Sequence, residues 1–231
     1  MTGLKNKLVT TAFIGAGFVG ALAMDRDARA ALVTVDIKGS VEWNQITAAP
    51  LSGAHVGDAA DLTFTIDSNN FVNNPTFPTR GYPIDISSFV LKFPTFQIGL
   101  KNPYPSGQTP YFVLRNNDPA VDGFLVSNNT SSDGGIPLNQ PGSVSDFANE
   151  FHATYGGSLL PSLNILDALG HYDFTGLTVF NWTIDDGPFN PLGILFSDMT
   201  ISAVPEPASM GVLLTLSSAA LMGRRRSRTV H

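Results

Sequence analysis

Apolar and polar residues alternate with a period of two in many short segments between residues 31 and 203. The clearest example is Leu62, Phe64 and Ile66, which share one face of an extended chain while Thr63 and Thr65 lie on the other. This pattern predicts β-strands. It recurs, or is replaced by a short apolar run, in Leu32–Ile37, Phe89–Phe93, Phe96–Leu100, Tyr111–Leu114, Phe124–Val126, Leu177–Ile184 and Leu192–Ile201.

Turn-forming clusters of Asn, Asp, Gly and Pro separate these segments, at residues 67–70, 116–119, 128–135 and 185–188. Short strands divided by such turns predict an all-β fold, an antiparallel β-sandwich or jelly roll. One segment differs: Ser162–Leu169 follows Pro161 and precedes Gly170, which predicts a short helix. The simplest division is a single domain over residues 31–203.

The charge and the cysteine content of that domain exclude several classes of function. Residues 31–203 hold 5 Lys and Arg against 16 Asp and Glu, a formal charge of −11. Nucleic-acid binding requires clustered Lys and Arg, so we expect no nucleic-acid partner. The chain has no cysteine, which excludes disulfides, thiolate metal sites and Cys nucleophiles.

The N-terminal 30 residues have the three parts of a secretory signal peptide. Lys5 and Lys7 form a positive region, residues 8–24 are apolar and uncharged, and Ala28-Arg29-Ala30 is an A-x-A cleavage site. We predict cleavage after Ala30, with a second site after Ala23. The alternative is a permanent signal anchor, although the apolar segment is close to the lower limit for spanning a bilayer.

The C-terminal 28 residues also have three parts in a fixed order. The motif Val204-Pro205-Glu206-Pro207 comes first, and an apolar segment, predicted to form a transmembrane helix over residues 208–223, follows it. Fifteen apolar or small residues in a helix span about 22 Å, slightly less than a bilayer core. The third part is a basic cluster, which the positive-inside rule places on the cytoplasmic side. It consists of Arg224, Arg225, Arg226 and Arg228.

This tail resembles the PEP-CTERM sorting signal, which is also called an ice-binding-protein C-terminal motif, a label that implies no ice binding. The resemblance covers residues 204–231 only. It implies recognition by an exosortase, a membrane-embedded transpeptidase-like enzyme, with processing near the Pro-Glu-Pro motif. It also implies transient anchoring in the bacterial inner membrane, followed by a place at the cell surface or in the extracellular matrix. Members of this family are associated with exopolysaccharide.

Candidate chemistry within the domain is limited to acidic residues in predicted turns. Oxygen-rich loops of this kind bind Ca²⁺, but Asp in turns also accepts hydrogen bonds from nearby backbone N–H groups. The sequence indicates no other cofactor, and it contains no nucleophile elbow, zinc-protease helix or phosphate-binding loop. The weak Ca²⁺ candidates are Asp118, Asp122, Asp133, Asp185 and Asp186.

These observations favour a non-enzymatic surface or extracellular-matrix protein. The first alternative is a carbohydrate-binding module of the same matrix, which would use exposed aromatic side chains; the candidates are Trp43, Tyr82, Tyr104, Tyr111 and Tyr155. The second alternative is a secreted hydrolase, which would need two carboxylates facing each other across a cleft.

Overall fold

The computed structural model describes residues 31–130, 134–187 and 191–205 as one antiparallel β-sheet of thirteen strands. The strands follow the order β3-β4-β7-β8-β10-β12-β13-β1-β2-β5-β6, with β9 beside β10 and β11 beside β13. Their bounds are β1 Leu32–Asn44, β2 Ala59–Asp67, β3 Val72–Asn73, β4 Thr79–Pro83, β5 Val90–Lys92, β6 Gln97–Ile98, β7 Tyr111–Arg115, β8 Val121–Ser127, β9 Ile136–Pro141, β10 Asp146–Gly156, β11 Gly170–Tyr172, β12 Leu177–Asp185 and β13 Leu192–Ala203.

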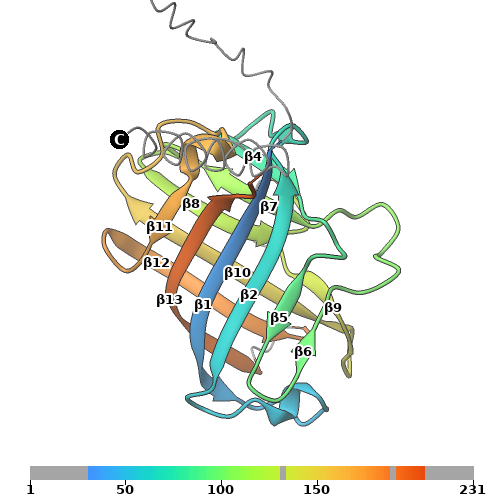
Figure 1. The fold of residues 1–231 in the computed structure, drawn as a ribbon. Coiled ribbons are helices and arrows are strands. Elements are labelled where there is room, and N and C mark those ends of the chain that lie inside the picture. The colour runs from blue at the N-terminus through green and yellow to red at the C-terminus, as the bar shows by residue number, and fades with distance from the viewer. Residues whose placement is uncertain (1–30, 131–133, 188–190, 206–231) are drawn as a thin grey trace, which may run out of the picture.

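The sheet folds over on itself into two layers (Figure 1). Strands β13, β1, β2 and β5 form one layer, and β4, β7, β8, β10 and β12 form the other, with strands that cross those of the first at a large angle. The layers join where β12 pairs with β13, and they approach again through a bridge between Ile66 and Ile84. The prediction of an all-β antiparallel fold is confirmed, and the arrangement is consistent with a β-sandwich.

The core lies between the layers and is built from the inward-facing residues of each strand. In β1, Val33, Val35 and Ile37 are fully buried, as the alternating pattern predicts. Aromatic rings cross the core in contact with one another: Phe112 lies 5.5 Å from Phe64 and 5.8 Å from Phe124 between ring centroids. Each buried ring removes a large apolar area from water, so these contacts stabilise the packing of the two layers.

All eight segments predicted as strands overlap strands of the structure, although β5 and β6 are shorter than predicted, and five further strands were missed. Of these, β10 is the most important, because it occupies the middle of the second layer between β8 and β12. The others are β3, β4, β9 and β11.

The predicted short helix over Ser162–Leu169 is wrong. The chain forms only a four-residue 3₁₀ turn, η2, over Ile165–Ala168; the other 3₁₀ turn, η1, is Leu51–Gly53. The hydroxyl of Tyr82 donates to the carbonyl of Leu163 at 2.8 Å and accepts from the N–H of Ile165 at 3.0 Å. These backbone groups are tied to the core, so the turn does not continue as an α-helix.

Candidate functional site

Both ends of the domain leave the sheet at the same place. β1 is the first strand and β13 the last, and they pair directly, with Val33 opposite Ala203 (Figure 1). The pairing extends one step further, because the N–H of Val204 donates to the carbonyl of Leu32 at 2.8 Å. Ala31 is held as well: its N–H donates to Ser68 Oγ and its carbonyl accepts from the N–H of Ser68, each at 3.1 Å.

The predicted sorting motif therefore starts directly after β13, at a residue that is still hydrogen-bonded to Leu32 of β1. Pro205 is exposed and has no N–H, so it cannot extend the pairing with β1. Among the residues that the structure describes, no helix is long and apolar enough to cross a membrane. The remaining sorting predictions lie outside the described residues: the signal peptide with Ala28 and Ala30, Glu206, Pro207, the apolar segment 208–223, Arg224, Arg225, Arg226 and Arg228.

Asp122, one of the Ca²⁺ candidates, is completely buried at the start of β8. Its carboxylate accepts the N–H of Asn117 at 2.8 Å and the N–H of Leu160 at 2.5 Å. It thus joins two loops that are distant in sequence. Its neighbour Asp118 instead forms an ion pair with Arg115, at 3.1 Å between Oδ2 and Nε. Both carboxylates have protein partners, which is what a structural role in turns requires.

Asp186 has a similar structural role at the far end of β12. Its carboxylate accepts the hydroxyl of Ser143 at 2.7 Å, the N–H of Ser143 at 2.5 Å and the N–H of Val144 at 3.3 Å. These donors lower the pKa of Asp186. The side chain therefore fixes the turn between β9 and β10 in its ionised form.

Asp185 differs from Asp186 because its carboxylate is buried and the hydrogen bond that it accepts is long. Burial, with smaller contributions from the negative charges of Glu150 and Asp186, raises the pKa of Asp185 to about 6, against a weak opposing hydrogen bond from Gly187. The N–H of Gly187 lies 3.3 Å from Oδ1. The charged form of Asp185 is therefore unfavourable in the folded protein.

We expect Asp185→Asn to stabilise the protein at pH 7 by about 1 kcal/mol, after allowance for solvent screening. The folded state of the wild type binds more protons than the unfolded state between about pH 4 and 6, so its free energy of unfolding falls as pH rises through this range. The variant has no carboxyl group at this position and does not lose stability in this way. The free energies of unfolding of the two proteins should therefore converge below pH 4. Urea unfolding at a series of pH values measures the difference; a constant difference at all pH values contradicts the assignment.

The structure does not assemble the acidic candidates into a metal centre. Within residues 31–130, 134–187 and 191–205, no group of three or more His, Asp or Glu side chains is arranged to hold a metal ion. Asp133 lies outside the described residues. Ca²⁺ binding therefore stays a prediction, with hydrogen-bonded turns as the role that the described carboxylates have here.

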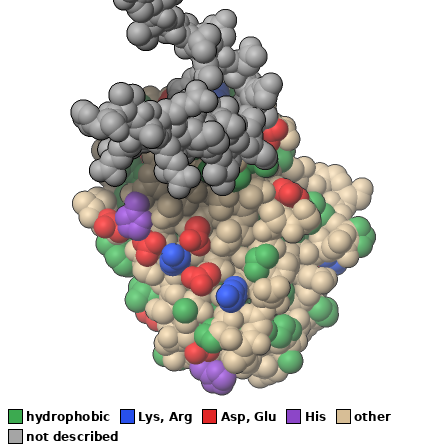
Figure 2. All heavy atoms as spheres, in the orientation of Figure 1, with side chains coloured by type: hydrophobic (Ala, Val, Ile, Leu, Met, Phe, Trp, Pro, Cys, Tyr) green, Lys and Arg blue, Asp and Glu red, His purple; other side chains and the backbone are tan. Residues whose placement is uncertain are grey.

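Acidic and basic side chains lie beside each other on one face of the domain. Figure 2 shows acidic and basic side chains close together on the outer face of the layer formed by β13, β1 and β2, surrounded by neutral surface. Lys38 on β1 lies 3.4 Å from Asp36, and the charges of Asp36, Asp198 and Asp61 raise its pKa. Such exposed pairs contribute little to stability but keep the face polar.

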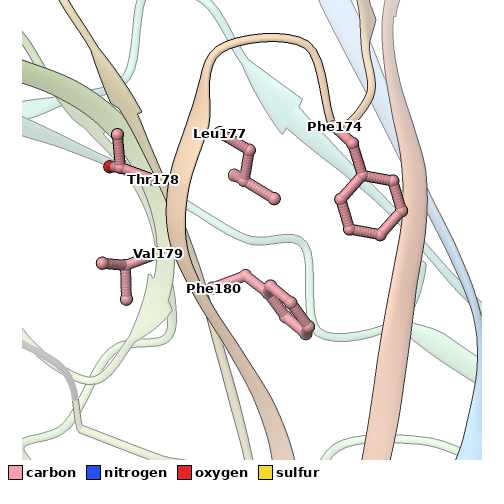
Figure 3. A pocket seen from close by; sticks show the side chains of 5 residues that line it. All are labelled: Phe174, Leu177, Thr178, Val179 and Phe180. Atoms are coloured by element: carbon pink, nitrogen blue, oxygen red, sulfur yellow. The ribbon is translucent and has the colours of Figure 1, made fainter.

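An apolar groove lies where β12 and β13 diverge. The two strands pair only at Thr183–Gly193 and Ile184–Leu192, so the preceding part of β12 stands apart from β13. A groove of about 420 Å³ remains there, lined by Phe174, Leu177, Thr178, Val179 and Phe180. Figure 3 shows Phe174, Leu177 and Phe180 between the two strands, whereas Thr178 and Val179 point to the other side of β12.

Two aromatic residues of the carbohydrate-binding hypothesis belong to the core instead. Tyr82 and Tyr155 are buried, and the Tyr155 hydroxyl donates to the carbonyl of Asp173 at 3.0 Å. Tyr104 is half-buried and donates to Asn128. Sequence reasoning missed the exposed rings of Phe71, Phe77 and Phe174, of which Phe174, 51% exposed, lies at the rim of the groove. Its position after β11 carries no alternating pattern that distinguishes it from a core residue.

No protein-family model, curated protein or solved structure matches this chain.

Proposed function

We propose that this chain is an exported bacterial surface or extracellular-matrix protein, sorted by an exosortase and associated with exopolysaccharide. The observation that carries the proposal is the three-part tail: Val204-Pro205-Glu206-Pro207, the apolar segment 208–223 and the arginine cluster 224–228. The predicted signal peptide at the N-terminus supplies the export route. The mature domain acts without catalysis, as a stable β-domain presented outside the cell.

Each part of the tail has a separate physical task. The two prolines keep the motif extended and accessible, because neither can continue a helix backwards. The apolar segment partitions into the bilayer, and the arginines fix its orientation by remaining on the cytoplasmic side. The end of β13 at Ala203 supports this division, since the last strand among the described residues ends where the motif begins.

The test replaces one part of the tail at a time in hosts with and without exosortase. Changing Pro205, Glu206 and Pro207 to Ala should leave membrane insertion intact and block processing, so that an unprocessed membrane-bound form accumulates. Changing the four arginines 224, 225, 226 and 228 to Glu should impair orientation or retention while the β-domain stays folded. Mass spectrometry and fractionation give the readout. An identical mature mass and location in both hosts would show that the tail is only a membrane anchor.

The second candidate, a carbohydrate-binding module, has one favourable observation. The half-exposed ring of Phe174 stands at the rim of the groove beside β12, where a sugar ring would find an apolar face. Binding to purified exopolysaccharide or to a glycan array separates this candidate from the first. A hydrolase has less support, because neither this groove nor the pocket between Gln45–Ala48 and Pro141–Ser143 is lined by two carboxylates.

A further inference from the structure

We infer that the end of the domain carrying Leu32 and Val204 lies directly against the lipid bilayer while the tail is still attached. This rests on the proposed function, because it takes residues 208–223 as the membrane-spanning segment. It adds an interaction surface on the folded domain itself. The partner is the interfacial region of a phospholipid bilayer, and the surface consists of Leu32, Phe71, Val72 and Val204, called here the apolar end.

The first argument is the length of the tether. Val204 is held in the sheet by its hydrogen bond to Leu32, and the apolar segment begins at Ala208. Only Pro205, Glu206 and Pro207 lie between them. Four Cα steps of at most about 3.5 Å cover no more than about 14 Å, so the domain cannot stand away from the membrane.

A second tether ends at the same place before the signal peptide is removed. The signal's apolar region ends at Met24, and Ala31 is fixed to Ser68 beside the first residue of β1. Seven Cα steps separate Met24 from Ala31, at most about 25 Å. Both membrane segments therefore hold the same end of the domain toward the bilayer.

The third argument is the composition of this end. Leu32, Phe71, Val72 and Val204 are between 38% and 51% exposed. Because Val33 pairs with Ala203, Leu32 stands opposite Val204 and points to the same outer face. Leu32 also pairs with Asp67, and the turn after Asp67 leads to Phe71 and Val72. The apolar side chains thus follow one another around the point where the chain leaves the fold.

One cation accompanies the apolar end. The guanidinium of Arg80 lies over the ring of Phe71, with Cζ 4.1 Å from the ring centroid, and its Nε donates to Asn73 at 2.7 Å. Aromatic rings and basic side chains are the residues that favour the headgroup region of a bilayer. The ring and the guanidinium suit the headgroup region locally, whereas the net negative charge of the domain opposes approach to an anionic surface, so the short tether is what holds this end at the bilayer.

The opposite end of β1 and β2 supplies a matched control. Val56 is 70% exposed in the turn before β2, where the N–H of the next residue, Gly57, donates to the carbonyl of Val41. Val41 is nine residues along β1 from Leu32, a distance of about 30 Å in an extended strand. A bilayer in contact with the apolar end does not reach Val56.

The test uses the absence of cysteine, which allows a single label to be placed without background. Full-length Val72→Cys and Val56→Cys variants, produced without exosortase, are labelled with a nitrobenzoxadiazole fluorophore. They are reconstituted into phosphatidylethanolamine–phosphatidylglycerol vesicles that contain a doxyl-labelled lipid quencher. We expect the label at position 72 to lose most of its fluorescence and the label at position 56 to keep it. A linker of about twenty Gly and Ser residues between Val204 and Pro205, with a mean span of about 25 Å, should reduce the quenching at position 72.

Sedimentation with the vesicles separates the ways in which this can fail. A protein that does not sediment with vesicles overturns both the anchor role of the tail and the apolar end. A protein that sediments, yet is quenched equally at positions 72 and 56, overturns only the apolar end. If the label at position 72 is shielded from aqueous iodide in detergent, and this shielding disappears when the protein is diluted at constant detergent, a second copy of the chain covers this surface, and the membrane assignment is wrong.

Discussion

Replacing Asp122 by Ala is expected to destabilise the domain of residues 31–205 by about 3 kcal/mol or more. The carboxylate is completely buried and accepts the N–H groups of Asn117 and Leu160. Its removal leaves the buried N–H of Leu160 and the part-buried N–H of Asn117 without their acceptor, and an unsatisfied donor costs about 1–3 kcal/mol where water cannot replace the lost bond. The loops 116–119 and 157–160 would also lose the side chain that joins them. Urea unfolding followed by tryptophan fluorescence measures the change.

Asp118→Ala is the matched control, because Asp118 lies in the same turn and was an equal candidate for Ca²⁺. Its carboxylate pairs with Arg115 at a partly exposed site, so the loss should be at most about 1 kcal/mol. Equal losses for the two variants would contradict the structural role of Asp122. A melting temperature that rises with Ca²⁺ in the wild type, and in neither variant, would instead favour the metal hypothesis.

The alternating pattern predicted the strands whose inward positions are uniformly apolar. In β2, Leu62, Phe64 and Ile66 are buried while Thr63 and Thr65 are not, as the sequence indicates. The same holds for β1 and for most of β13. A strand with one apolar face has a single favourable orientation against a core, so its sequence carries enough information by itself.

β10 was missed because its inward face is not uniformly apolar. Phe147, Phe151 and Tyr155 point inward, but so do Asn149 and Ala153. The buried amide of Asn149 interrupts the pattern at the centre of the strand. An alternating pattern that allows one polar residue on the inward face predicts this strand.

The long-range order of the strands could not be read from local patterns. β1 pairs with β13, although they stand at opposite ends of the domain in sequence. That pairing brings together the two ends of the domain, beside the predicted signal peptide and the predicted sorting tail. Alternation specifies which face of a strand is buried, but it does not specify which strand lies beside it.

The candidate site divides in the same way. The sorting tail is a contiguous segment, so residue order alone predicts its role. The role of an acidic residue depends on which loops approach it. Asp186 accepts the N–H of Ser143 and Asp122 accepts the N–H of Leu160, each from a distant part of the chain. The sequence shows which turns contain carboxylates. It does not show whether backbone N–H groups or a cation will bind to them.

The buried pair of Trp182 and Asn149 provides the second large effect. Trp182 is 1% exposed, its ring meets Phe151 edge to face at 5.7 Å, and its Nε1 donates to Asn149 Oδ1 at 2.9 Å. Trp182→Ala is expected to cost about 4 kcal/mol, because it removes a large core ring and leaves a cavity. Trp182→Phe keeps much of the apolar contact but removes the donor, and should cost about 2 kcal/mol.

A double-mutant cycle with Asn149→Leu isolates the hydrogen bond from the packing. Among the described residues, Asn149 Nδ2 has no hydrogen-bond partner. The buried amide therefore leaves one donor unsatisfied in the folded protein. Asn149→Leu alone leaves the indole N–H of Trp182 buried without an acceptor. In Trp182→Phe combined with Asn149→Leu, neither group remains, so the double variant should be more stable than the sum of the single losses by about 1–2 kcal/mol. Urea unfolding of the four proteins gives the coupling energy. Strict additivity would show that the hydrogen bond contributes nothing, and that Trp182 stabilises the core through its apolar surface alone.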